Sequence, residues 1–210
     1  MRISDFELFI FDFDGTLSKP TLLVSLLRYF KRRYNVDFIL SHSELFASAK
    51  EPEISGSKAE KEESFYSKLY NFYSFFFKPK IKKNAVEILE GLKKRNKKIA
   101  LFSDGKEDRI RKELAMLGLE KYFDIVLAAD AIKIFKPNPT PLLLIAKNMH
   151  VPISKSIYIG DMAVDILTAK FAKMSSCAVG DGLGTTQSIK KAKPDFFFEN
   201  LEAMKKELKI

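Results

Sequence analysis

Residues 7–17 have the sequence ELFIFDFDGTL, a short apolar run that ends on Asp12, Asp14 and Gly15. Such a run is typical of a strand that is buried on both faces of a parallel sheet. In open α/β sheets, ligands bind beyond the carboxyl ends of the strands. The segment therefore predicts a strand of this kind, with a reaction centre at its carboxyl end.

The two carboxylates point to a metal ion. Side chains at i and i+2 share one side of a strand, and Gly15 frees the backbone so that Asp14 can turn toward a group bound by Asp12. Crowded negative charges need a cation, and ligands that are all oxygen favour Mg²⁺, which would also attract phosphate. The alternative is a strand-to-turn junction with solvated carboxylates.

Two later segments carry groups suited to binding an anion. The apolar residues 99–102 precede Ser103, Asp104 and Gly105, where a hydroxyl and backbone N–H groups can hold phosphate oxygens. Serine after a strand is also a common turn former. Lys136, followed by Pro137, precedes a predicted helix that runs to about residue 149, and it offers a point charge for phosphate.

A fourth segment repeats the pattern of a strand that ends on an acid. Residues 156–160 are followed by Asp161, and Asp165 lies one helical turn further on. We expect Asp161 to be a Mg²⁺ ligand, and Asp165 to orient Lys136 or a metal-bound water from outside the ligand shell.

In their order along the chain, these segments resemble the four motifs of the haloacid dehalogenase superfamily of aspartate-nucleophile phosphotransferases. The resemblance implies that Asp12 is the nucleophile, that Asp14 is the acid and base, and that Lys136 keeps Asp12 ionised and binds phosphate. The implied metal ligands are Asp12, Asp14 and Asp161, with Asp165 beyond them. The implied phosphate contacts are Thr16, Ser103, Asp104, Gly105 and Lys136.

An acid at position 14 indicates the type of reaction, because the superfamily's dehalogenases lack one there and its ATP-driven pumps carry threonine. The resemblance therefore implies a Mg²⁺-dependent phosphatase that acts on a small phosphate monoester. A sugar phosphomutase is the alternative, and it would need an acid–base group from the cap. Residues 180–185 and 194–198 resemble the ending of phosphoglycolate-phosphatase-like members, although Asn84 and Lys173 stand where glycine is frequent in that subgroup.

The pattern along the chain predicts an α/β fold: a Rossmann-like parallel sheet with helices on both faces, formed by residues 1–17 and 84–210. Helices near 84–95 and 107–117 alternate with strands that end at Phe102 and span 125–128. Residues 18–83 show helical spacing without a convincing strand, and they resemble the all-helical cap that some superfamily members insert after the first motif. Pro20 and Pro79 mark hinge-like joints.

Composition excludes few classes of protein. Hydrophobic residues make up 46% of the chain and charged residues 30%, as in ordinary soluble globular proteins. There is no apolar run of about 20 residues, and Asp5 and Glu7 argue against a secretory signal, so we expect a cytoplasmic location without membrane contact. The single cysteine, Cys177, is predicted to be a buried, inert thiol.

The basic balance of the chain leaves its partners open. Lys and Arg number 36 against 27 Asp and Glu, a net charge of +9 at pH 7, which permits binding to nucleic acid. The best local patch combines basic and aromatic residues: Arg28, Tyr29, Phe30, Lys31, Arg32, Arg33 and Tyr34. It is interpreted as a solvated helix face, a nucleic-acid site, or a surface that steers anionic substrates. Of the two histidines, His150 is predicted at the surface and His42 in the cap, and neither has a catalytic role.

Overall fold

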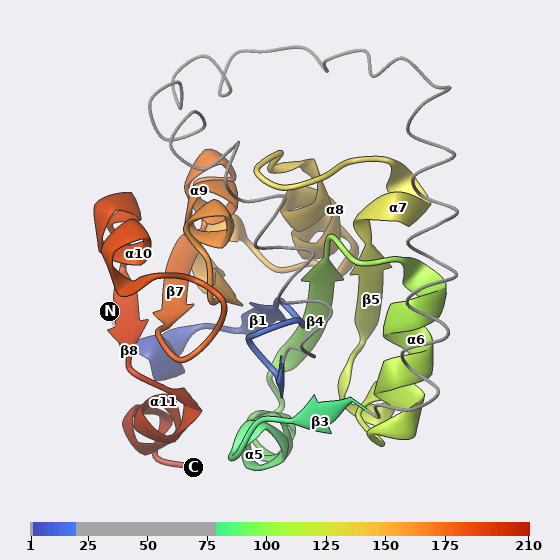
Figure 1. Cartoon of the computed structure of the whole chain (residues 1–210), viewed down its shortest axis with the longest axis horizontal. Coiled ribbons are helices and arrows are strands. Elements are labelled where there is room, and N and C mark those ends of the chain that lie inside the picture. The colour runs from blue at the N-terminus through green and yellow to red at the C-terminus, as the bar shows by residue number, and fades with distance from the viewer. Residues whose placement is uncertain (1, 20–78) are drawn as a thin grey trace. The chain divides into compact units, whose positions relative to one another are not determined.

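The computed structural model describes residues 2–19 and 79–210, and residues 2–19 and 80–210 belong to one compact unit (Figure 1). The parallel sheet that the sequence predicts is present, and it has six strands in the order β5-β4-β1-β6-β7-β8. The strands are β1 (Leu8–Phe11), β4 (Lys98–Ser103), β5 (Ile125–Ala128), β6 (Ser156–Gly160), β7 (Ser175–Val179) and β8 (Phe196–Phe198). The helices are α5 (Ala85–Lys94), α6 (Glu107–Met116), α7 (Ala129–Ile132), α8 (Thr140–Asn148), α9 (Ala163–Phe171), α10 (Thr186–Ala192) and α11 (Leu201–Leu208). Short 3₁₀ turns occur at Ile3–Asp5, Glu120–Tyr122 and Ile153–Lys155.

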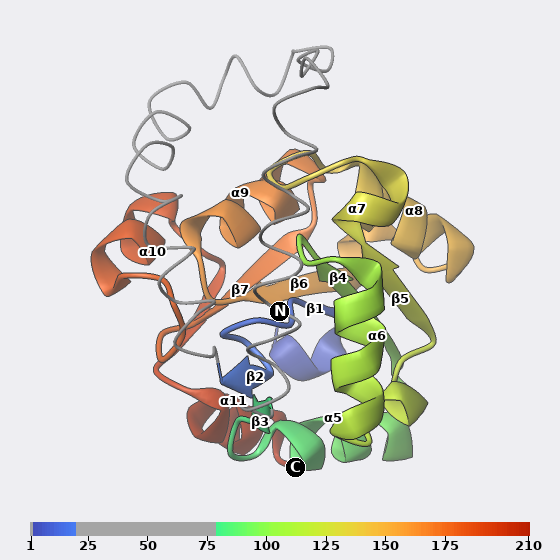
Figure 2. The same ribbon diagram turned by 45° about the vertical axis from the view of Figure 1, so that its right-hand side comes forward.

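The central strand β1 is buried on both faces because its side chains alternate between two cores. Phe9 and Phe11 enter a core shared with α5, α6 and α11, whereas Leu8 and Ile10 enter a second core shared with α7, α8 and α9. Figure 2 shows these two groups of helices on opposite faces of the sheet. The two-sided burial explains why the strand is uniformly apolar.

The insertion begins and ends at a small antiparallel ribbon that the sequence pattern did not predict. Ser18–Lys19 forms β2 and Lys80–Ile81 forms β3, and Ser18 pairs with Ile81. The expectation that residues 18–83 contain no strand is therefore wrong at both ends. The cause is tertiary: the Lys82 N–H donates to the Leu17 carbonyl at 2.8 Å, so the returning chain aligns with the departing one. The expected helical cap, the basic patch at 28–34 and His42 lie outside the described residues.

Asn84 and Lys173, where the resemblance leads us to expect glycine, both take up a conformation that glycine adopts easily. Asn84, with φ of 66°, precedes α5, and Lys173, with φ of 54°, follows α9. Asparagine tolerates this left-handed region better than most residues, whereas lysine pays a strain cost there.

Other expectations within the described residues are confirmed. The predicted strand 125–128 matches β5, and α5 and α6 fall within the predicted helical ranges. His150 is exposed, and Cys177 is fully buried. Burial raises the pKa of the Cys177 thiol far above its ordinary value, which keeps it protonated. Within residues 2–19 and 79–210, no helix has the length and apolar character that crossing a bilayer requires.

Candidate active site

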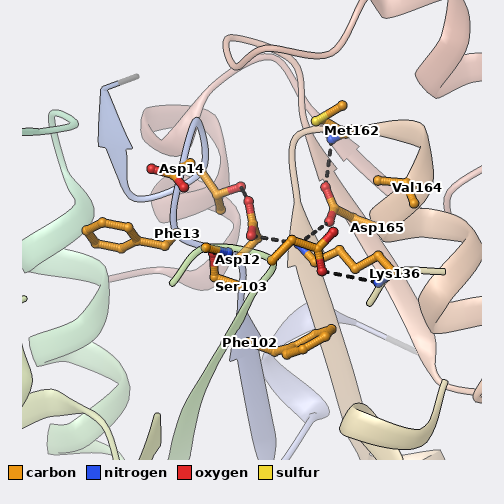
Figure 3. A network of polar contacts seen from close by, with 12 residues as sticks. Asp12, Phe13, Asp14, Phe102, Ser103, Lys136, Met162, Val164 and Asp165 are labelled. Atoms are coloured by element: carbon orange, nitrogen blue, oxygen red, sulfur yellow. Dashed lines mark hydrogen bonds and ion pairs between the residues drawn. The ribbon is translucent and has the colours of Figure 1, made fainter. Parts of the chain in front are cut away.

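Polar residues from separate segments meet at the carboxyl edge of the sheet. Phe11 pairs with Leu101 of β4 and with Ile159 of β6, so the residues that follow these strands emerge side by side. Asp12 follows β1, Ser103 ends β4, and Asp161 follows β6. The fourth segment reaches the same edge because the loop between α7 and α8 carries Lys136 into it (Figure 3).

Lys136 is the electrostatic centre of this cluster. Its ammonium lies 2.7 Å from Asp12 Oδ1 and 2.7 Å from Asp165 Oδ1, and its side chain is only 4% exposed. The ammonium also stands over the rings of Phe102 and Tyr158, at 5.6 and 5.4 Å from their centroids. Lys136 is therefore a buried cation that is fixed on several sides.

The surroundings of Lys136 keep it charged. Burial is the strongest single influence and lowers the pKa of Lys136, but the carboxylates of Asp12 and Asp165 outweigh it and raise the pKa well above its ordinary value. A permanent positive charge beside Asp12 suits a group that binds phosphate and stabilises an anionic carboxylate.

Three buried carboxylates form a group that could hold a metal ion. Among the described residues, Asp12, Asp161 and Asp165 each place a carboxylate oxygen within 4.8 Å of the others. The Thr16 hydroxyl connects two of them, at 3.1 Å from Asp161 Oδ1 and 3.5 Å from Asp12 Oδ2. Three acids beside a single lysine leave an excess of negative charge, and the ligands are all oxygen, so the residues present fit Mg²⁺.

Asp161 is enclosed by the segment 180–184, which we call the glycine loop. The Leu183 N–H donates to Asp161 Oδ2 at 2.5 Å. A Cβ at Gly182 would lie 2.2 Å from Asp161 Cβ, and one at Gly184 would lie 1.9 Å from the Asp161 carbonyl oxygen. Only residues without a side chain permit this approach, so the glycines of this loop are needed to hold the acid in place.

The glycine loop is also tied to the ribbon where the insertion ends. Lys82, directly after β3, is buried, and its ammonium lies 2.6 Å from Asp181 Oδ1. Asp181 itself is 43% exposed. A chain of contacts therefore runs from the end of the insertion, through the glycine loop, to Asp161.

Asp14 is held by a residue that the sequence analysis did not identify. The guanidinium of Arg109 in α6 contacts both of its carboxylate oxygens, with Nη1 at 2.9 Å from Oδ1 and Nη2 against Oδ2. Glu113, one turn further along α6, lies 3.4 Å from the same Nη1. Burial, and secondly the charge of Asp14, raise the pKa of Glu113 to about 8. Figure 3 shows Asp14 turned away from the side chain of Lys136.

The structure also shows what each predicted phosphate-binding residue contacts. Ser103 is fully buried, and its hydroxyl oxygen accepts the Gly105 N–H at 3.1 Å. The Asp104 carboxylate accepts the backbone N–H of Lys136 at 3.1 Å, so it anchors the loop between α7 and α8 that carries Lys136. Lys136 and Thr16 lie within the acidic cluster. Asp165 also accepts the Met162 N–H at 2.9 Å, which fixes the start of α9.

Arg109 and Tyr158 are the residues of this site that sequence reasoning missed. Arg109 is one of 36 basic residues, and the signal that could have identified it as a site residue is its place on the helix that follows Ser103. Tyr158 looks like an ordinary strand residue, yet its hydroxyl donates to the Phe102 carbonyl at 3.1 Å and lies 3.5 Å from Asp165 Oδ1.

Fold and site together define a class: α/β proteins with an acidic, lysine-containing site at the carboxyl edge of a parallel sheet. The family profile described as haloacid dehalogenase-like hydrolase matches residues 9–179. The chain belongs to the haloacid dehalogenase-like hydrolases.

Curated relatives resemble part of the chain. It is 30% identical over 130 residues to "Putative pyrophosphatase PpaX" of Caldanaerobacter subterraneus subsp. tengcongensis, a match that covers 62% of this chain and 59% of that protein. It is 29% identical over 120 residues to the phosphoglycolate phosphatase of Pseudomonas fluorescens, covering 57% of this chain and 44% of that one. The chain thus spans less than two thirds of the length of the curated relatives it matches.

Solved structures extend the likeness in fold over nearly the whole chain. A hydrolase from Pseudomonas syringae shares the fold with a TM-score of 0.75 at 21% identity, over 97% of this chain and 98% of that one.

Proposed function

We propose that this protein is a Mg²⁺-dependent phosphatase that hydrolyses a small phosphate monoester through an aspartyl-phosphate on Asp12. The observation that carries the proposal is the setting of Asp12, a carboxylate at the end of the central strand, 2.7 Å from the buried Lys136 ammonium and grouped with Asp161. The names of the curated relatives, a phosphoglycolate phosphatase and a pyrophosphatase, support phosphate as the group removed.

In this proposal, each residue has a stated task. Asp12 attacks phosphorus, and Asp14 gives a proton to the leaving oxygen and later accepts one from the attacking water. Lys136 and the Ser103 hydroxyl contact the phosphoryl oxygens, where transferred phosphate gains its stabilisation. Asp12 and Asp161, with Asp165 close by, would hold Mg²⁺, which when bound supplies positive charge to the phosphoryl oxygens. Asp14, the third ligand that the resemblance implies, has its carboxylate against Arg109, and its part in metal binding stays a prediction.

We further propose that residues 18–83 form a helical cap domain on a core of residues 1–17 and 84–210. The pairing of β2 with β3 supports this division, because the insertion leaves and rejoins the core at one point. A segment with adjoining ends can be a separate unit that selects the substrate.

The test is phosphate release from p-nitrophenyl phosphate by purified protein with Mg²⁺, with and without a chelator. Asp12→Asn keeps the volume of the side chain but removes the nucleophile, so we expect a folded protein with less than about a hundredth of wild-type turnover. The exposed Asp108 in α6 provides the control, and Asp108→Asn should stay within about twofold of wild type. Turnover above about a tenth of wild type in Asp12→Asn would refute the nucleophile. Conversion of a sugar monophosphate into its positional isomer, without release of free phosphate, would indicate the mutase.

A further inference from the structure

Lys82 lies where the insertion ends, and both its backbone and its side chain are held. The Lys82 N–H donates to the Leu17 carbonyl at 2.8 Å, and the Lys82 carbonyl accepts the Ala85 N–H at 3.2 Å. The side chain is only 6% exposed, and lysine is almost never buried to this degree without a partner. Its ammonium lies 2.6 Å from Asp181 Oδ1. Lys82 is therefore a fixed point that can restrain the segment on which Asp181 lies.

That segment is the glycine loop, and the structure anchors it at both ends. At one end, the Gly180 N–H donates to the Phe198 carbonyl of β8 at 2.8 Å. At the other end, the side chain of Thr185 caps the start of α10. Asp181 lies between these anchors and is 43% exposed. The ion pair with Lys82 thus adds a third anchor, which ties the loop to the ribbon of β2 and β3.

The same loop orients the carboxylate of Asp161. The Leu183 N–H donates to one of its oxygens, and the Thr16 hydroxyl donates to the other. The backbone at Gly182 comes so close that a Cβ there would lie 2.2 Å from Asp161 Cβ. A small shift of the loop would therefore turn a carboxylate that is expected to bind the metal ion. Contacts of this kind tune metal affinity because they orient the ligand before the ion binds.

We propose that Lys82 is a positioning residue for the metal site: its ion pair with Asp181 holds the glycine loop against Asp161, so the affinity for a divalent cation depends on that pair. The inference rests on the proposed Mg²⁺-dependent phosphatase function and adds a determinant of metal affinity outside the ligand set. It couples the ribbon where the insertion ends to the carboxyl edge of the sheet. Because such coupling is reciprocal, a cation bound at Asp161 stabilises the ion pair in return.

A direct effect of charge gives different expectations from an effect of position. Lys82→Met removes a positive charge, so the electric field alone would make a cation bind more tightly. Asp181→Asn removes a negative charge, so the field alone would weaken binding. The double variant leaves the net charge of the pair unchanged, so the field alone would leave the affinity as in wild type. If the pair acts by position, all three variants release the loop and all three bind the cation more weakly.

Cation binding to the purified, full chain tests the proposal without any use of turnover. The probe is Mn²⁺, which takes the same oxygen ligands as Mg²⁺ and whose free concentration is measured by electron paramagnetic resonance. The Kd for Mg²⁺ follows from competition with Mn²⁺. Circular dichroism verifies that each variant is folded. The matched control is Lys83→Met, because Lys83 is the next residue, is 82% exposed and lies 3.5 Å from Glu202.

Lys82→Met and Asp181→Asn should each raise the Kd for both cations about 3- to 10-fold. This is less than the loss of about 10- to 100-fold that follows when a direct partner of a metal ligand is removed, because the pair acts through the loop. The double variant should bind no more weakly than the weaker single variant, since the pair is already broken in each. Lys82→Arg keeps a cation that can reach Asp181, so it should lose less affinity than Lys82→Met. Lys83→Met should stay within about twofold of wild type.

Several results would overturn the positioning role and leave the phosphatase function standing. They are tighter Mn²⁺ binding by Lys82→Met, wild-type affinity in the double variant, and losses that multiply in the double variant. Lower stability with an unchanged Kd would also overturn it, because the pair would then serve only the fold. If Lys82→Met does not fold, the double variant decides, since it leaves no buried charge without its partner.

The failure of the proposed function gives a different pattern. If wild type binds Mn²⁺ but releases no phosphate from p-nitrophenyl phosphate, the phosphatase function fails, and the titrations still decide the role of Lys82. If folded wild type binds neither cation, the metal site and the positioning role fail together.

Discussion

Replacing Lys136 with methionine should expose the electrostatic cost of the buried acids. The methionine side chain is about as long as that of lysine but carries no charge, so the change removes the charge with little change in packing. Asp12 and Asp165 each lose a contact of 2.7 Å. Asp165 keeps the Met162 N–H at 2.9 Å, and Asp12 keeps the Thr16 hydroxyl at 3.5 Å.

The expected loss follows from these contacts. Removing one partner of a buried ion pair costs about 3–5 kcal/mol, because the remaining buried charge loses its counter-ion. Since Asp165 retains a backbone donor, we expect a loss within that range and not twice as large. For a chain of this size, it corresponds to a fall in Tm of about 6–20 °C. Addition of Mg²⁺ should restore part of the loss, because a bound cation replaces the missing charge beside Asp12.

The measurement is urea unfolding with EDTA and with Mg²⁺, followed by far-UV circular dichroism because the chain contains no tryptophan. Lys147→Met is the control, since Lys147 is exposed on α8 and the substitution should change the free energy of unfolding by less than about 0.5 kcal/mol. A loss below about 1 kcal/mol for Lys136→Met in EDTA would refute the reasoning. So would equal stabilisation of wild type and variant by Mg²⁺.

Three further perturbations address other parts of the site. Gly182→Ala brings a methyl group against Asp161, so we expect a loss of about 1–3 kcal/mol in the free energy of unfolding. Mg²⁺ should raise the Tm of this variant less than it raises the Tm of wild type. An equal increase in Tm would contradict the packing argument. Lys82→Met and Asp181→Asn should show a coupling energy of about 1 kcal/mol in a double-mutant cycle. We expect a small value because Asp181 is 43% exposed. Additive losses would show that the ion pair does not contribute to stability. The pKa of Glu113 is raised to about 8 from an ordinary 4.5, so its contribution to stability is complete below about pH 4.5 and is lost as the pH rises through 8. The stability of Glu113→Gln relative to wild type should therefore increase between pH 6 and 9. A stability difference that does not vary with pH would disprove this.

The sequence predicted the central strands well because they are buried on both faces. The strand β1 (Leu8–Phe11) is apolar throughout, and the acids Glu7 and Asp12 flank it, so its limits can be read without tertiary information. The ribbon of β2 and β3 was missed because strands of two residues have no periodicity. They pair only because the two ends of the insertion meet.

For the site, the order of the motifs was enough to predict that Asp12, Lys136 and Asp161 would meet. The contact between Asp165 and Lys136 was also expected, but the contact between Asp14 and Arg109 was not. The contact of the Asp104 carboxylate with the backbone N–H of Lys136 was not predicted, and the expectation that Asp104 contacts phosphate stays a prediction. Arg109 was missed because a charged residue on a helix is most often solvated, and its burial depends on the space that Gly105 leaves.

The position of β1 has a consequence for how the chain folds. The first strand of the chain lies in the middle of the sheet, where Phe11 pairs with Leu101 on one side and with Ile159 on the other. Both partner strands are far from β1 in the sequence, so a large loss of loop-closure entropy opposes either pairing. Topologies of this kind fold slowly. During synthesis, the apolar segment Leu8–Phe11 emerges from the ribosome long before β6, and until then it has an unpaired edge. We therefore expect the strand that leads to Asp12 to be the segment of the nascent chain most in need of a chaperone.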